Sequence, residues 1–284
     1  MAKITIVTDG SSDIDPEFAT ELGIEVVPVL AKVDTKVYRV GIDLTDDQIY
    51  ELMATGQQKV EIATPSSTVF EQVYRRLIGN VDHVFSLHLG ARLGSIHSHA
   101  AAAKSRLPAS TTRLEVIDSK SASFGLGSVA IAAAQAALAG ATPDEVSRLI
   151  HATIRHTHVV FFVDTMEHLE ASGRLTLAGS VLGSMQRIKP LMILDEGEIV
   201  PYERTRTRAK AIEGLFTFVE DFPRVQEVTV LYVTSPEDVE KLLDKIDPIF
   251  PRDRVRVARF GSAIAAHLGP GAMGVTVFEG LEEG

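Results

Sequence analysis

Four loops in the sequence combine glycine or proline with hydroxyl or carboxylate side chains, and each precedes a segment that predicts a helix. They are TDGSSD at 8–13, IATPSS at 62–67, GARLGS at 90–95 and DSKSASFGLGS at 118–128. A helix start binds anions, because its first amides lack intrahelical partners and carry partial positive charge. Each loop alone is equally typical of helix capping, so an anion site requires several of them to meet.

The loop GARLGS does not match the known motifs for phosphate binding or serine catalysis. A Walker loop needs four residues between its glycines and then Lys-Ser/Thr, whereas Gly90 and Gly94 enclose three and Ser95 follows directly. The nucleophile elbow G-x-S-x-G is absent around Ser95, Ser11 and Ser66. What remains for this loop is an anion seat built from helix amides and the Ser95 hydroxyl.

Histidines offer two further kinds of chemistry. His97 and His99 lie two residues apart on the expected helix, so they point to different sides and do not favour a shared metal ion. An unusual catalytic triad built on His88 or His267 stays open as an alternative. We therefore predict no metal site and no cofactor.

The elements that must position these loops alternate between apolar runs and amphipathic segments. Predicted strands cover 3–9, 24–33, 82–89, 113–119, 158–165, 189–202, 225–233 and 254–260. Predicted helices cover 15–23, 45–56, 66–80, 127–141 and 142–156. This alternation predicts an α/β fold with mainly parallel sheets, in which ligands bind beyond the carboxyl ends of the strands.

The second half has a different character, because DEGE joins two strands as in a hairpin and ERTRTRAK opens a helix. We therefore predict two domains. Residues 1–158 form an N-terminal α/β domain with a parallel sheet, and residues 159–284 form a C-terminal α/β domain.

Composition excludes several classes of function. The chain has 284 residues, a net charge of −10, 45% hydrophobic residues and no cysteine. The negative charge argues against a nucleic-acid partner, which would need clustered Lys and Arg. The start shows no signal peptide, and no run approaches the roughly 18 apolar residues of a membrane span. We expect a cytoplasmic protein, without disulfides, for which transient membrane contact stays open.

Taken in order, eight stretches resemble the landmarks of the DegV family and span nearly all of the chain. They are TDGSSD, TPSS, SLHLGARLGS, VIDSKSASFGLG, LEASGRL, IKPLM, GEIVPYERTR and HLGPGAMGV. The resemblance implies two α/β domains with a long-chain fatty acid such as palmitate buried between them. It also implies a carrier that is not catalytic alone. A separate ATP-binding subunit of a fatty-acid kinase would phosphorylate the presented carboxylate to an acyl phosphate for phospholipid synthesis.

The departures from the family pattern fall at the head-group site. Ile62 stands where the family has a threonine, and Thr64 offers a hydroxyl two residues later. Gly94 stands at the family's carboxylate-binding serine, and Ser95 at its glycine. The resemblance therefore implies one of two arrangements. Either Thr64 and Ser95 replace the family's fatty-acid-binding hydroxyls, or backbone amides at the helix start bind the carboxylate. His267 matches the histidine near the ligand's head.

Three arginines match basic positions of the family. They are Arg174, Arg204 and Arg206, and Arg174 would face the kinase. Two other functions stay open. One is a stand-alone hydrolase or transferase using Asp9, Ser11 and His267, and the other is a lipid sensor that needs no kinase.

Overall fold

The computed structural model describes residues 2–173 and 188–280, and the chain forms two compact units. Unit 1 comprises Met1–Ile154 and Gly261–Ala263, and unit 2 comprises Arg155–Phe260 and Ile264–Gly284. The predicted Arg174 lies outside the described residues. The chain thus enters unit 2 near residue 155 and contributes one short later segment to unit 1.

Unit 1 is built on a parallel sheet of four strands in the order β2-β1-β6-β7, which confirms the parallel sheet expected for the N-terminal half. These strands are β1 (Ile4–Asp9), β2 (Glu25–Val27), β6 (His83–His88) and β7 (Arg113–Asp118). The helices of unit 1 are α1 (Pro16–Glu21), α2 (Asp46–Thr55), α3 (Ser67–Leu77), α4 (Ile96–Lys104), α5 (Phe124–Leu138) and α6 (Pro143–His156), the last of which ends in unit 2.

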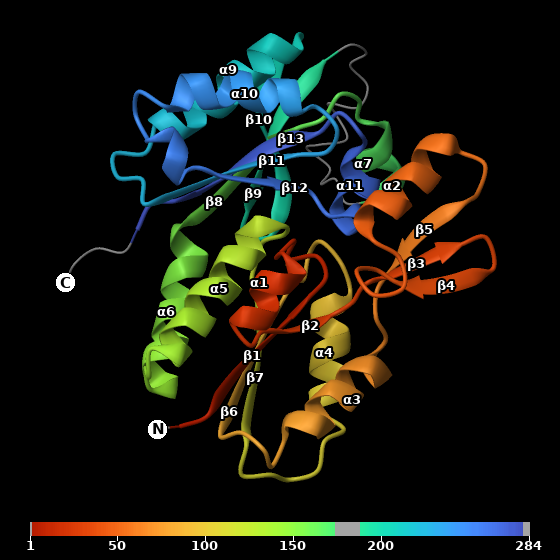
Figure 1. Cartoon of the computed structure of the whole chain (residues 1–284), viewed down its shortest axis with the longest axis vertical. Coiled ribbons are helices and arrows are strands. Elements are labelled where there is room, and N and C mark those ends of the chain that lie inside the picture. The colour runs from red at the N-terminus through yellow and green to blue at the C-terminus, as the bar shows by residue number, and fades with distance from the viewer. Residues whose placement is uncertain (1, 174–187, 281–284) are drawn as a thin grey trace. The chain divides into compact units, whose positions relative to one another are not determined.

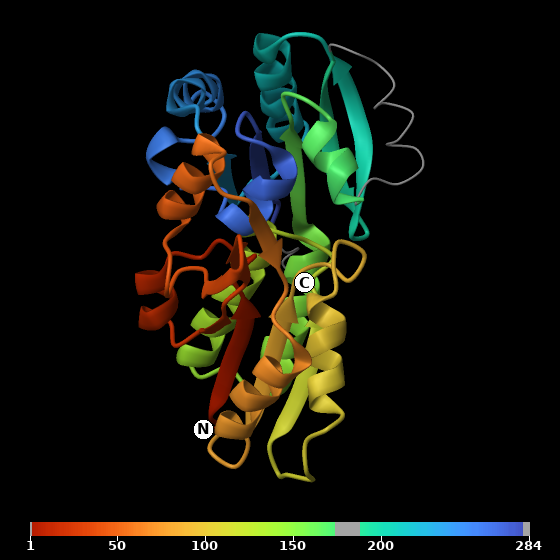
Figure 2. The same cartoon turned by 90° about the vertical axis from the view of Figure 1, so that its right-hand side faces the viewer.

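Helices cover both faces of this sheet. In Figure 1, α3 and α4 lie on one side of β1, β6 and β7, and α5 lies on the other. Figure 2 shows α3 and α4 in front of the strands. Apolar spacing explains the packing of α3, which buries Phe70, Val73 and Tyr74 along one stripe. A small residue lets α5 pack closely against the loop after β1, because a Cβ on Gly127 would lie only 2.5 Å from the Ser12 carbonyl oxygen.

A second, smaller sheet in unit 1 was not expected from the sequence. It is antiparallel, with the order β4-β3-β5, and contains β3 (Leu30–Val33), β4 (Lys36–Arg39) and β5 (Val60–Ala63). The predicted strand at 24–33 is therefore two strands, in two sheets, with Pro28 between them. Proline has no backbone N–H to donate to a ladder, so it favours an end of strand pairing. Helix α5 also begins at Phe124, earlier than the predicted residue 127.

Unit 2 is a mixed sheet of six strands in the order β10-β9-β8-β13-β11-β12, in which only β11 and β12 pair in parallel among the described strands. The strands are β8 (Thr157–Phe162), β9 (Lys189–Asp195), β10 (Glu198–Thr205), β11 (Glu227–Tyr232), β12 (Arg256–Arg259) and β13 (Met273–Phe278). The described helices are α7 (Glu167–Ser172), α9 (Arg208–Glu220), α10 (Pro236–Ile246), the short 3₁₀ helix η1 (Arg252–Arg254) and α11 (Ser262–Leu268).

The core of unit 2 lies between this sheet and the pair α9 and α10. Leu215 and Val219 of α9 and Leu242 of α10 are fully buried there against Val160 and Val275 of the sheet. The hairpin predicted at DEGE is present, since β9 and β10 pair antiparallel through Asp195 and Glu198. This hairpin and the antiparallel β13 explain why the second half is not a parallel sheet.

Candidate functional site

The loops that the sequence singled out meet at one edge of the parallel sheet. Strands β1, β6 and β7 run in the same direction, so the residues that follow Asp9, His88 and Asp118 leave the sheet side by side. This is the edge where α/β proteins bind ligands. The fourth loop, 62–67, follows β5 and reaches the same place through a contact with Ser95.

The two substitute hydroxyls predicted from the sequence lie together. Thr64 Oγ1 is 3.2 Å from Ser95 Oγ, although the residues are 31 positions apart. Ser95 is the N-cap of α4 and is exposed, and its side chain makes no capping hydrogen bond. Thr64 is half-buried. Both hydroxyls are therefore positioned to bind the same small polar group.

The start of α4 supplies further donors beside this hydroxyl pair. The first intrahelical bond runs from the His99 amide to the Ser95 carbonyl oxygen (3.0 Å), so the amides of residues 96–98 precede the helical ladder. His99 Nδ1 lies 2.9 Å from the carbonyl oxygen of Pro65, which ties the helix to the 62–67 loop. Partial burial lowers the pKa of His97, although the charge of Asp118 opposes this shift. This shift disfavours a positive charge on His97, so the backbone amides and the two hydroxyls are the groups at this helix start that we expect to bind an anion.

Ile62 and Gly94 have no side-chain group that can donate a hydrogen bond. Ile62 lies in β5 opposite Ala31, and it is half-buried. Gly94 is half-buried and directly precedes the Ser95 cap. The nearest hydroxyl side chains in these two loops are those of Thr64, two residues after Ile62, and Ser95, directly after Gly94.

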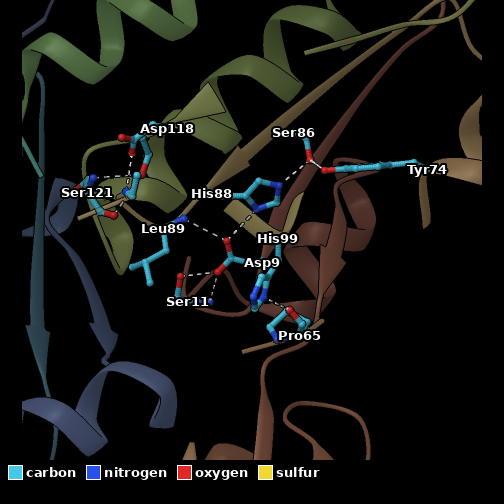
Figure 3. Close-up of polar contacts among 12 residues, drawn as sticks. Asp9, Ser11, Pro65, Tyr74, Ser86, His88, Leu89, His99, Asp118 and Ser121 are labelled. Atoms are coloured by element: carbon cyan, nitrogen blue, oxygen red, sulfur yellow. Dashed lines mark hydrogen bonds and ion pairs between the residues drawn. The ribbon is translucent and has the colours of Figure 1, made fainter. Parts of the chain in front are cut away.

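Asp9 is the hub that joins the loops after β1 and β6. Its Oδ1 accepts hydrogen bonds from the amide (3.0 Å) and the hydroxyl (2.5 Å) of Ser11. Its Oδ2 accepts from the Leu89 amide (3.1 Å) and lies 3.0 Å from His88 Nδ1. All four residues are buried. Figure 3 shows these contacts converging on one carboxylate.

A chain of polar side chains continues from His88 into the interior (Figure 3). His88 Nε2 lies 2.7 Å from Ser86 Oγ, which in turn lies 2.8 Å from the Tyr74 hydroxyl. The rings of Phe70 and His88 pack in a T-shaped arrangement with 5.0 Å between their centroids. The order Ser86, His88, Asp9 is that of a catalytic triad. Ser86 is fully buried inside β6, however, so a substrate cannot reach its hydroxyl.

The sequence predicts only one member of this hydrogen-bonded chain, His88, and only as part of an unusual triad. The available signal was the alternation of Ser86 and His88 in an otherwise apolar strand, since period two places both side chains on one face. Their mutual hydrogen bonds satisfy polar groups that the strand buries.

The loop after β7 holds the loop after β6 in place. Asp118 Oδ1 accepts hydrogen bonds from the amides of Ala91 (3.0 Å) and Lys120 (2.9 Å), and the Gly90 amide donates to the Ser121 carbonyl oxygen (2.8 Å). A Cβ on Gly90 would lie 3.3 Å from the backbone of Lys120 and of Ser121. Gly90 thus serves the close approach of two loops rather than a phosphate.

The remaining predicted site residues belong to unit 2. His267 lies on α11 and is half-buried. Arg204 lies on β10 and Arg206 directly follows that strand, and both are exposed.

Residues 2–173 and 188–280 show neither a metal-binding cluster nor a membrane-spanning helix. These residues contain no group of three or more His, Asp or Glu side chains that could hold a metal ion. No helix among them is long and apolar enough to cross a bilayer.

Comparison with known proteins agrees with the architecture. Residues 3–280 match the family described as "Uncharacterised protein, DegV family". A DegV domain-containing protein of Caldanaerobacter subterraneus is 30% identical, with 97% of this chain and 98% of that protein covered.

Two solved structures have nearly the same fold. DegV of Bacillus subtilis, described as a fatty acid binding protein, aligns with a TM-score of 0.87 at 27% identity over 98% of this chain and 100% of that one. A DegV family protein of Thermus thermophilus, described by its fatty acid binding, aligns with a TM-score of 0.86 at 28% identity over 98% and 99%. The family match and the relative that is 30% identical together show that this chain belongs to the DegV family.

Proposed function

We propose that this chain binds a long-chain fatty acid and presents its carboxylate to a separate kinase subunit. The observation that carries the proposal is the hydroxyl pair of Thr64 and Ser95, 3.2 Å apart, at the start of α4. The fatty acid binding described for the Bacillus and Thermus relatives supports the choice of ligand. The shift of both hydroxyls by one or two residues is compatible with this ligand, since they still converge.

Magnitudes explain why the head-group contacts can vary without loss of binding. Burial of about 14 methylenes at about 0.8 kcal/mol each contributes about 11 kcal/mol. A hydrogen bond to a charged carboxylate contributes only about 1.5 to 3 kcal/mol. The tail therefore dominates affinity, and the head contacts fix where the carboxylate points.

The position of the carboxylate matters for its presentation to the kinase subunit rather than for retention of the fatty acid. In the proposed transfer, a carboxylate oxygen attacks the γ-phosphorus of ATP held by the kinase subunit, and ADP leaves as the acyl phosphate forms. The exposed Arg204 and Arg206, together with Arg174, are the residues we assign to kinase docking. Substitution of Arg174 by Ala should then weaken the complex without releasing lipid.

The stand-alone enzyme is less well supported. Ser11 is 2% exposed and donates its hydroxyl to the fully buried Asp9. A nucleophile in that position has no route to substrate, and Asp9 is already occupied by His88 and by two amides. Turnover of simple esters or phosphate esters by the chain alone would favour the enzyme instead.

The first test is organic extraction of purified protein followed by mass spectrometry. We expect a co-purifying long-chain fatty acid. The proposal fails if the purified protein contains no fatty acid and also does not bind added palmitate. A lipid sensor that needs no kinase would bind palmitate equally well. Acyl phosphate formation with ATP and a DegV-dependent kinase subunit, trapped by hydroxylamine, separates the two.

The second test uses Ser95→Ala, with Ser105→Ala as the matched control. Ser105 is exposed at the other end of α4, where its hydroxyl donates to the Ala102 carbonyl oxygen. We expect Ser95→Ala to reduce acyl phosphate formation more than palmitate retention, and Ser105→Ala to change neither. Equal losses in both assays for Ser95→Ala would remove Ser95 from the head-group site.

A further inference from the structure

Two of the polar loops of unit 1 are joined by a contact that the proposed function does not use. Ser123 Oγ donates a hydrogen bond to Asp13 Oδ2 at 2.5 Å, across 110 positions of sequence. The Ser123 amide also donates to the Ser11 carbonyl oxygen (2.8 Å). Both Asp13 (φ 52°) and Ser123 (φ 51°) have a positive φ, which is unfavourable for residues other than glycine. Such backbone conformations persist where the surroundings enforce them, often at functional positions.

The other oxygen of Asp13 faces the short later segment of unit 1, Gly261–Ala263. A Cβ on Gly261 would lie 2.5 Å from Asp13 Oδ1 and 3.7 Å from Asp46 Oδ2. The next amide, that of Ser262, donates to Asp46 Oδ1 at 2.6 Å. The segment is thus bordered by two carboxylates, from the loop after β1 and from the first turn of α2, and the lack of a side chain at Gly261 leaves room for that of Asp13.

The environment of Asp13 disfavours its charge. Oδ1 is inaccessible to solvent, although the residue as a whole is only part-buried. Burial is the main cause that raises the pKa of Asp13, to about 7, and the charges of Asp46 and Asp9 raise it further. The Ser123 hydroxyl and the nearby Gly261 backbone act in the opposite direction. No well-formed hydrogen bond from a described residue reaches Oδ1.

We propose that Asp13 and Asp46 form a proton-dependent latch on Gly261–Ala263. With Asp13 protonated, the two carboxyl groups border the segment without mutual repulsion, and the Ser262 amide stays bonded to Asp46. Loss of the proton places two negative charges beside Gly261 and loosens the hold on the segment. The latch does not depend on the proposed ligand or on a kinase.

The test measures opening of the latch by amide hydrogen exchange at Ser262 in the full chain, between pH 5 and pH 8, corrected for intrinsic exchange. Opening exposes Asp13 and releases its proton, so the opening constant should rise by up to about tenfold per pH unit to pH 7 and then level off. Asp13→Asn should remove this dependence. The control Asp144→Asn, an exposed aspartate at the start of α6, should keep it.

An opening constant that is flat in the wild type, or that rises equally in Asp13→Asn, would overturn the latch. Should Asp13→Asn not fold, carbon-13 NMR of the carboxyl groups in the wild type decides the question. An Asp13 carboxyl that titrates near pH 7, and at a higher pH in Ser123→Ala because the hydrogen bond that lowers its pKa is lost, supports the proposal. An Asp13 carboxyl that titrates near pH 4 contradicts it.

Discussion

Replacement of Asp13 by Asn should change how the stability of the protein depends on pH. Burial and the neighbouring charges raise the pKa of Asp13 from 3.8 to about 7 in the folded state. A shift of about three units at about 1.36 kcal/mol per unit corresponds to about 4 kcal/mol between the two protonation states. Asn resembles the neutral acid in size and still offers an acceptor to Ser123.

The sign of this pH dependence follows from which state, folded or unfolded, binds the Asp13 proton more tightly. Because the folded pKa lies above the unfolded one, the folded state binds more protons between about pH 4 and pH 7, and stability falls as the pH rises through this window. Below it the aspartate is neutral in both states. We therefore expect Asp13→Asn to be about as stable as the wild type near pH 4. At pH 8 it should be more stable by up to about 4 kcal/mol.

The assay is urea unfolding of both proteins at half-unit steps from pH 4 to pH 8, with Asp144→Asn as the control for loss of one surface charge. Only the difference between variant and wild type matters, because all other titrating groups are common to both. A difference that stays flat with pH, or that grows in favour of the wild type as the pH rises, would refute the argument from burial.

Two further variants test the packing of unit 1 by urea unfolding. Gly127→Ala gains up to about 1 kcal/mol of helix propensity, but its Cβ would lie 2.5 Å from the Ser12 carbonyl oxygen. Overpacking costs about 1 to 3 kcal/mol, so we expect the variant to be less stable than the wild type. A more stable variant would show that α5 can move away from Ser12. Thr112→Val removes a hydroxyl that donates to the Val81 carbonyl oxygen (2.6 Å) and accepts from the Gly79 amide (2.9 Å). We expect a loss of about 1 to 3 kcal/mol that Thr112→Ser largely restores, whereas an equal loss in Thr112→Ser would assign the effect to the methyl group.

Much of the fold could be predicted from local pattern. The apolar runs that became β1, β6 and β7 are separated by helical segments, and this order nearly enforces parallel pairing. The small antiparallel sheet was missed because β4 and β5 are only four residues long and largely exposed, which gives weak periodicity. The break at Pro28 carried a readable signal, since proline cannot donate to a ladder.

For the candidate site, the sequence predicts residues but not the residues that each of them contacts. The family resemblance implies Thr64 and Ser95 as the substitute hydroxyls, and their 3.2 Å contact is a property of the folded chain. The wider sequence-based assignments, with domains at 1–158 and 159–284 and roles for His267, Arg174, Arg204 and Arg206, stay predictions. The roles of these four residues concern the bound fatty acid and the kinase subunit, and the proposed experiments with both test them.

By itself the sequence determined the α/β class, the loops that carry polar groups and membership of a family whose landmarks keep their order. These properties are local, because they depend on residue type and on spacing over a few positions. Only the tertiary structure decided that Asp9 joins His88, that Ser95 meets Thr64 and that Asp13 meets Ser123. Such contacts connect distant positions, and the burial that raises the pKa of Asp13 exists only once the chain has excluded water around it.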